Sequence, residues 1–156
     1  MKILRNILIA LFIAGFATPV LAINTYSVDF ESASNQYLTS ALTNFPLGNT
    51  ARTIELYVKL ESAIDSAMMR YGTAATAQNW RWHYYAGSSL GDIIETHGGD
   101  ASAKSSTALS AGVWTHRAIT YDGTTLRYYR NCVADGTATF GTQPNTTGDA
   151  ENFLLG

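Results

Sequence analysis

The segment Thr53-Ile54-Glu55-Leu56-Tyr57-Val58-Lys59-Leu60 alternates apolar and polar side chains without interruption. In an extended chain successive side chains point to opposite faces, so the four aliphatic residues share one face and Glu55, Tyr57 and Lys59 share the other. Such alternation predicts a β-strand with one buried face and one hydrated face. We therefore expect Ile54, Leu56 and Val58 to lie in the core.

Shorter runs of β-favouring residues, separated by clusters of turn residues, occur along the rest of the chain. They predict strands at residues 26–30, 36–39, 67–71, 80–85, 91–96, 113–121, 125–130 and 132–134. Asp122-Gly123 lies between two of these runs and is typical of a hairpin turn, and Asp135-Gly136 predicts a second turn. Residues 61–69 predict a loop with one helical turn at most. The fold class predicted is all-β, an antiparallel β-sandwich of the jelly-roll type.

The first 22 residues predict an export signal. Lys2 and Arg5 give a positive start, an apolar run of about ten residues follows, and Ala22 closes a small-residue cleavage site. The run is short for a membrane span, which argues against the alternative of an uncleaved anchor helix. We expect residues 1–22 to be a signal peptide with a helix and residues 23–156 to be one secreted domain, extracellular or periplasmic.

Charge and cysteine content restrict the partners. The formal charge of the whole chain is −2, and Lys2 and Arg5 would leave with the signal. The remaining basic residues are scattered, whereas nucleic-acid binding needs a basic patch. The sequence contains no second long apolar run that would predict a membrane span. The single cysteine, Cys132, excludes an internal disulfide. Three roles for Cys132 stay open: a buried small hydrophobic residue, a free thiol, or half of an intermolecular disulfide. The residue type favours burial.

The sequence predicts no enzyme. None of the three histidines has a second ligand at zinc spacing, and neither a nucleophile elbow nor a phosphate loop is present. The main enzyme alternative is a glycosidase, which needs two carboxyl groups roughly 5–9 Å apart across the scissile bond. Asp92 and Glu95 come nearest, but their odd spacing places them on opposite faces of a strand.

The run Trp80-Arg81-Trp82-His83-Tyr84-Tyr85 supplies the candidate ligand site. Trp80, Trp82 and Tyr84 fall on one face, which is favoured as core. Arg81, His83 and Tyr85 fall on the other, where an aromatic ring beside hydrogen-bonding groups suits a sugar. For metals, acids in loops suit calcium, and Asp100, Asp149 and Glu151 are the candidate ligands.

Three stretches resemble the laminin-G-like branch of the concanavalin A-like lectin/glucanase superfamily, in its bacterial jelly-roll form. Val28-Asp29-Phe30-Glu31 with Gln36-Tyr37-Leu38 is similar to its opening L-D-F-(D)-G…D-Y-V, and residues 52–59 to F-T-I-E-A-W-V-K. Residues 112–126 are similar to G-x-W-H-H-V-A-V-T-Y-D-G-T-T-L. The resemblance implies that Trp114 and Ile119 are buried.

Two departures from this family pattern lead to further expectations. Asn131-Cys132 stands where the family has Asn-Gly, and cysteine disfavours the positive φ of a type I′ turn. Residues 152–156 resemble the penultimate strand of the family, so we expect a sandwich that lacks its last strand. The strand at residues 26–30, or its neighbour, would then have an open edge and permit self-association.

The resemblance implies a secreted, non-catalytic recognition domain that binds carbohydrate or mediates adhesion, with calcium as a candidate cofactor. Its partner would be an extracellular glycan or protein. Two alternatives stay open: a structural or protein–protein interaction module that binds no sugar, and a degenerate glycoside hydrolase.

Overall fold

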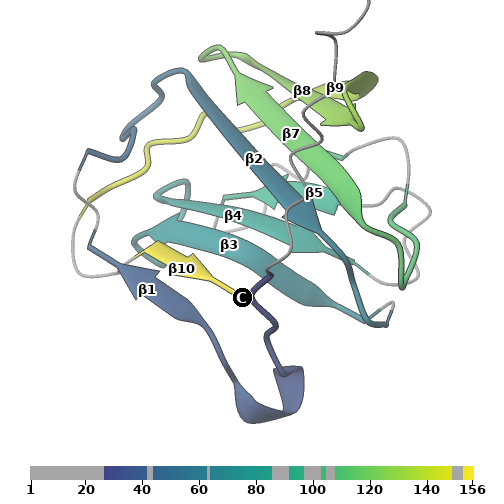
Figure 1. The fold of residues 1–156 in the computed structure, drawn as a ribbon. Helices are drawn as coiled ribbons and strands as arrows, with labels where there is room; N and C mark the ends of the chain where they lie inside the picture. The colour runs from purple at the N-terminus through teal and green to yellow at the C-terminus, as the bar shows by residue number, and fades with distance from the viewer. Residues whose placement is uncertain are drawn as a thin grey trace, which may run out of the picture.

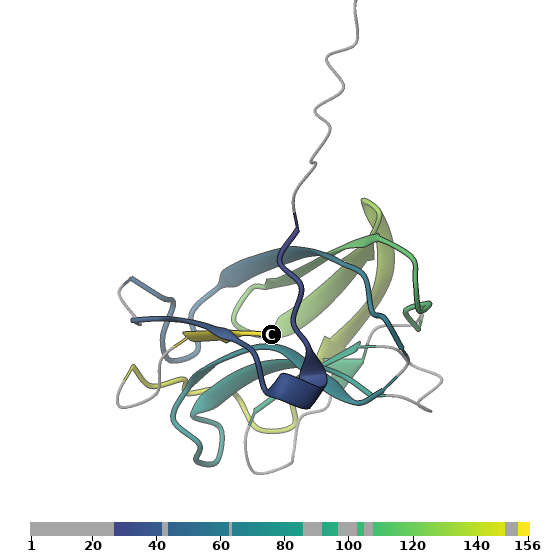
Figure 2. The same ribbon diagram turned by 60° about the horizontal axis from the view of Figure 1, so that its bottom comes forward.

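The computed structural model describes residues 27–41, 44–62, 64–85, 92–96, 103–104, 108–148 and 153–156. Two antiparallel sheets lie face to face and enclose the core between them (Figure 1, Figure 2). The predicted all-β sandwich is therefore confirmed. In the described ranges the sole helical element is the 3-10 turn Ser32–Ser34, and no helix there is long and apolar enough to cross a membrane.

The larger sheet has six strands in the order β1-β10-β3-β4-β5-β6. Its strands are β1 (Leu38–Ser40), β3 (Ser66–Gly72), β4 (Asn79–Tyr84), β5 (Asp92–Glu95), β6 (Ala103–Lys104) and β10 (Phe153–Leu155). The smaller sheet has the order β2-β7-β8-β9. Its strands are β2 (Arg52–Val58), β7 (Thr115–Tyr121), β8 (Thr125–Arg130) and β9 (Val133–Thr139).

The core consists of the inward-facing residues of both sheets. Trp80 and Trp82 of β4 are fully buried and Tyr84 nearly so, as the alternation predicted. From the smaller sheet, Ile119 and Leu126 pack against them. On β2 the predicted face is correct, but Ile54, Leu56 and Val58 are only half-buried, because β2 lies at the edge of its sheet.

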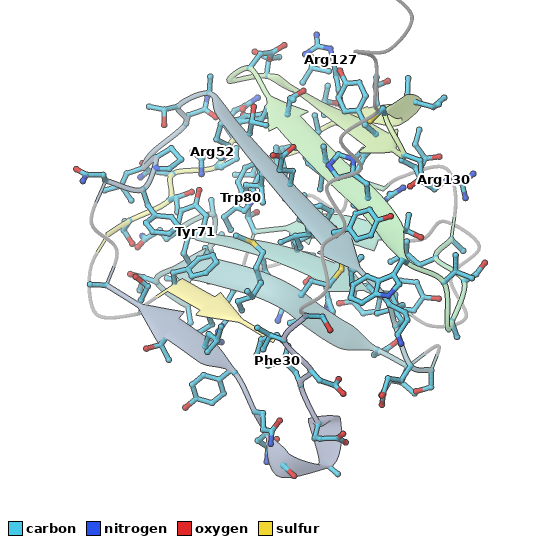
Figure 3. All side chains as sticks on the ribbon, viewed as in Figure 1. Phe30, Arg52, Tyr71, Trp80, Arg127 and Arg130 are labelled. Atoms are coloured by element: carbon cyan, nitrogen blue, oxygen red, sulfur yellow. The ribbon has the colours of Figure 1, made fainter. Side chains whose placement is uncertain are left out.

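Arg52 of the smaller sheet contacts residues of the larger sheet and of two loops at one end of the sandwich. Its guanidinium lies 4.4 Å from the centre of the Trp80 ring. Nη1 donates to Tyr71 Oη (2.7 Å) and to Thr146 Oγ1 (3.1 Å), and Nη2 donates to the Gly48 carbonyl (2.7 Å). Figure 3 shows Arg52, Trp80 and Tyr71 gathered between the two sheets. Burial raises the pKa of the Tyr71 hydroxyl, although the nearby Arg52 charge opposes the shift.

A buried ion pair replaces one of the predicted turns. Asp135 and Gly136 lie inside β9, so the prediction of a turn there is wrong. The Arg117 side chain is fully buried, and its Nη1 lies 2.5 Å from Oδ2 of Asp135, which is 7% exposed. The ion pair holds the Asp135 side chain in the core. The register shift between Tyr128 and Tyr129 accommodates Asp135 as an extra residue within the strand, so no turn forms there.

The two remaining hairpin turns keep the positions predicted for them. Gly123, at φ +100°, closes the hairpin of β7 and β8 after Asp122. Asn131 (φ +49°) and Cys132 (φ +66°) connect β8 to β9 with both residues in the left-handed region. Cys132 is exposed, so the expectation of a buried thiol is wrong. The left-handed conformation strains Cys132 by roughly 1–2 kcal/mol.

The N-terminal strand prediction fails where the structure tests it. Residues 27–30 form no strand, whereas β1 begins at Leu38, two residues beyond the predicted start. Tyr26 and the predicted signal at residues 1–22 lie outside the described residues. Phe153–Leu155, assigned to a penultimate strand, lies between β1 and β3, with Leu155 opposite Leu38 and Met69.

Candidate functional site

Two exposed aromatic rings and the half-buried ring of His116 lie on the outer face of the smaller sheet. We call Tyr57, Trp114 and His116 the aromatic platform. Tyr57 is 63% exposed and Trp114 is 42% exposed. Their rings stack with centroids 5.6 Å apart and an angle of 15° between the planes, and the His116 ring lies 6.3 Å from Tyr57. The platform thus offers flat apolar surface in contact with solvent.

The exposure of Trp114 corrects its expected burial. Along β7 the odd-numbered residues Ile119 and Tyr121 face the core. Trp114 has the even parity of His116, and the register places both on the outer face with Tyr57. The parity of this segment could have revealed the placement from the sequence, but the family resemblance favoured the core.

Charged groups surround the platform. The Lys59 ammonium lies 5.6 Å from the centre of the Trp114 ring, within range of a cation–π contact. His116 Nε2 lies 3.5 Å from Oε2 of the exposed Glu55. With a cation over the Trp114 ring and a carboxylate beside His116, the platform can contact both the CH groups and the hydroxyl groups of a ligand.

A groove of about 650 Å³ opens beside the platform, and we call it the β2 groove. Its lining includes residues 56–61 and residues 27–30, and Trp114 also lines it. The floor is apolar, because Met68 and Leu155 of the larger sheet reach it. The platform and the groove together form one continuous surface.

Three carboxylates meet at this groove. Ligand atoms of Asp29, Glu31 and Glu61 lie within 4.8 Å of one another, and all three residues are exposed. Carboxylate oxygens are the ligands that calcium prefers. The predicted calcium ligands Asp100, Asp149 and Glu151 lie outside the described residues.

The predicted ligand site lies on the outer face of the larger sheet, where Arg81, His83 and Tyr85 converge on Glu95. Arg81 Nε donates to Glu95 Oε2 at 3.0 Å, Arg81 Nη2 contacts the same oxygen, and Tyr85 Oη donates to Oε1 at 2.6 Å. The rings of His83 and Tyr85 lie 4.2 Å apart. Sequence reasoning placed the three side chains on one face but did not include Glu95.

The pKa shifts indicate that the charged groups around Glu95 already have partners within the cluster. Burial alone would raise the pKa of the Glu95 carboxyl, but the hydrogen bonds from Tyr85 and Arg81 bring that pKa below its ordinary value. Burial and the Arg81 charge lower the pKa of His83. Both Glu95 oxygens are therefore engaged by an ionised network, and a ligand there would have to displace one of its members.

Comparison with known proteins adds the evolutionary context. A protein-family profile described as "Concanavalin A-like lectin/glucanases superfamily" matches residues 32–156. No curated protein sequence matches the chain.

Among the solved structures that share the fold, two are described by the sugars bound to them. One is domain 4 of AbnA, a GH43 extracellular arabinanase from Geobacillus stearothermophilus, in complex with arabinotriose. It has 20% identity and a TM-score of 0.53, over 71% of this chain and 53% of that one. The other is the CBM40 of Ruminococcus gnavus IT-sialidase, bound to α2,3-sialyllactose. It has 15% identity and a TM-score of 0.50, over 70% of this chain and 64% of that one. The chain thus spans between half and two-thirds of the length of these structures.

Proposed function

Because the chain belongs to the concanavalin A-like lectin/glucanase superfamily, we propose that it is a secreted, non-catalytic carbohydrate-binding domain whose ligand lies on the aromatic platform. The observation that carries the proposal is the exposed stack of Tyr57 and Trp114. Contiguous apolar surface that stays exposed to water is typical of ligand and partner sites. Tyrosine and tryptophan suit such sites because each combines a large apolar ring with a polar group.

The chemistry of a sugar matches the platform. The CH face of a pyranose or furanose ring packs on an indole or phenol ring, where it removes apolar surface from water. The hydroxyl groups at its rim would meet Lys59 as donor and Glu55 as acceptor, since both are exposed beside the rings. The neighbouring β2 groove extends this surface for further sugar units.

The surface formed by Arg81, His83 and Tyr85 remains a second candidate for the same function. It offers a ring and hydrogen-bonding groups, but Glu95 already engages Arg81 and Tyr85. The aromatic platform has fewer internal bonds to break, so we assign the ligand to it.

Calcium assistance is the finer part of the proposal. Asp29, Glu31 and Glu61 offer three carboxylates to a hard cation, and Asp29 and Glu61 also line the β2 groove. A calcium ion held there would offset two of the three negative charges and draw residues 27–30 toward β2.

The test is a glycan array probed with the purified chain in calcium and in EDTA. The arabino-oligosaccharides and sialylated glycans that the two solved relatives hold are included. We expect binding to a defined glycan class, weaker in EDTA, without any cleavage product. Failure to bind any glycan favours a protein-interaction module, and a released product would identify a hydrolase.

Point variants locate the site once a ligand is known. Truncation of a central aromatic contact costs 2 kcal/mol or more, so Trp114→Ala and Tyr57→Ala should each weaken binding about 30-fold. Val113→Ala, at the adjacent exposed apolar residue, is the matched control and should leave the affinity unchanged. If Tyr85→Ala abolishes binding and Trp114→Ala does not, the ligand lies on the larger sheet.

A further inference from the structure

The outer edge of β2 carries the strongest feature that sugar binding leaves unexplained. In the part of the chain that the structure describes, β2 pairs with β7 and stands at the end of its four-stranded sheet. Figure 1 shows it at the margin of that sheet, facing the N-terminal segment. Residues 27–30 lie across the β2 groove and belong to neither sheet. An edge of this length invites pairing with another strand.

The direction of the free backbone groups follows from neighbouring hydrogen bonds. The Leu60 carbonyl accepts from Gly112 N at 2.7 Å, on the β7 side of β2. The His116 carbonyl accepts from Asn131 N, on the β8 side, so His116 and its partner Tyr57 form a non-hydrogen-bonded pair. Even-numbered residues of β2 therefore bond to β7. The N–H and C=O groups of the odd-numbered residues, Thr53 to Lys59, point to the free edge.

The side chains below this edge are apolar and incompletely covered. Leu56 and Val58 face inward but are only half-buried, and they line the β2 groove with Leu60. A strand added to the edge of β2 would cover them. Both the unpaired backbone and the apolar groove thus call for the same kind of occupant, an extended segment with alternating side chains.

The charges on the edge select the occupant. In an antiparallel pairing of β2 with its own copy about Tyr57, Glu55 lies opposite Lys59 of the second copy, and the reverse pair follows by symmetry. All these residues are odd-numbered and have the free backbone groups. On the inner face, Leu56 would meet Val58 of the second copy.

The other registers available to the odd-numbered residues match charges less well. An axis at Glu55 or at Lys59 places like charges opposite each other, which destabilises a sheet. An axis at Val58 opposes Glu55 to Glu61, and an axis at Leu56 leaves both Glu55 and Lys59 without a charged partner. The edge is self-complementary in one register.

We propose that β2 pairs antiparallel with β2 of a second copy of this chain, about a twofold axis at Tyr57, so that two four-stranded sheets join into one of eight strands. The inference does not rest on sugar binding, although Tyr57, Glu55 and Lys59 belong to both surfaces. Centred on Tyr57, the ladder runs from Ile54 to Leu60. These seven residues make a small interface, so we expect a dissociation constant in the micromolar range.

Sedimentation equilibrium over a range of concentrations tests the pairing with charge-reversal variants. The chain is expressed from Met1 so that any processing takes place. Glu55→Lys and Lys59→Glu each turn two attractive cross-strand pairs into two repulsive ones, and each should weaken the dimer at least about tenfold. The doubly exchanged variant, E55K with K59E, restores opposite charges and should dimerise like the original chain. Mixing the two single variants should give a heterodimer.

A matched control separates pairing from net charge. Thr139→Lys adds a positive charge to β9, at the other edge of the same sheet, and should leave the dimer unchanged. The proposal is overturned if the original chain is a monomer up to about 0.1 mM, well above a micromolar dissociation constant. It is equally overturned if the doubly exchanged variant associates as poorly as the single variants.

Discussion

Arg117 is a charged side chain that is fully buried. It lies among the inward residues of β7, and the Asp135 carboxylate of β9 provides its counter-charge at 2.5 Å. Removing two charges from water is costly, and their attraction repays that cost only while both partners are present. The pair therefore ties β9, an edge strand, to the interior of its sheet.

Arg117→Leu should destabilise the protein by about 3–5 kcal/mol, because it leaves the Asp135 carboxylate in the core without its guanidinium partner. The double change Arg117→Leu with Asp135→Leu should cost much less than the sum of the two single changes. Urea unfolding followed by tryptophan fluorescence measures both. Additive costs would mean that the two side chains are not coupled.

At the scale of the element, the hairpin of β7 and β8 is organised by the side chain that begins its turn. Asp122 Oδ1 accepts from the backbone N–H groups of Thr125 (2.8 Å) and Thr124 (3.0 Å), and Oδ2 accepts from Arg127 Nη1 (2.6 Å). The Thr125 hydrogen bond, followed by the Arg127 bond, lowers the pKa of the Asp122 carboxyl from 3.8 to about 2. The folded hairpin thus favours the ionised acid.

This shift predicts a pH dependence with a defined sign. A pKa lower in the folded state gives stability that is complete above pH 3.8 and is lost as the pH falls towards 2. In Asp122→Asn this part of the acid sensitivity should be absent. The measurement is the free energy of unfolding between pH 5 and pH 2 for both proteins, with an NMR titration of the Asp122 carboxyl. A titration midpoint near 3.8 would contradict the contacts.

Elements that carry their own pattern could be predicted from the sequence. The alternation in residues 53–60 identified β2 and its inward face, and Asp122-Gly123 identified a hairpin. Residues 26–30 have a similar pattern, but a strand needs a partner, and the segment at residues 27–30 has none among the described residues. Asp135-Gly136 has the composition of a turn, yet burial beside Arg117 overrides that local preference. Likewise, single-strand patterns placed Arg81, His83 and Tyr85 together but could not bring Trp114 to Tyr57, which depends on the β2–β7 register.

For the whole molecule, β10 is the strand that unites the larger sheet. It pairs with β1 on one side and with β3 on the other. Leu155 lies opposite Leu38 and Met69 and packs against the core, whereas Leu154 lies opposite Thr39 and Arg70 on the other face. The two adjacent leucines thus differ in what they bury.

Leu155→Ala should destabilise the protein by about 2 kcal/mol, at the lower end of the range for buried leucines because the side chain is only half-buried. Leu154→Ala is the matched control: Leu154 is also half-buried but does not pack against the core cluster, so its loss should be smaller, about 1 kcal/mol. Thermal unfolding of the two variants makes the comparison. Equal losses would show that β10 does not face the core in this register.

The strand order β1-β10-β3 also has a consequence in time. β1 is among the first strands to be synthesised, yet it is joined to the sheet through residues 153–155. Because β1 pairs with residues 153–155, it cannot join the sheet before those residues are made, and closing so long a loop adds an entropic cost. Until then β3 has a bare flank while Trp80 and Trp82 are already available to collapse against β7 and β8. A chain in which β1 and β3 have not yet met β10 would have unpaired strand edges, and these edges would be exposed to mispairing until residues 153–155 arrive.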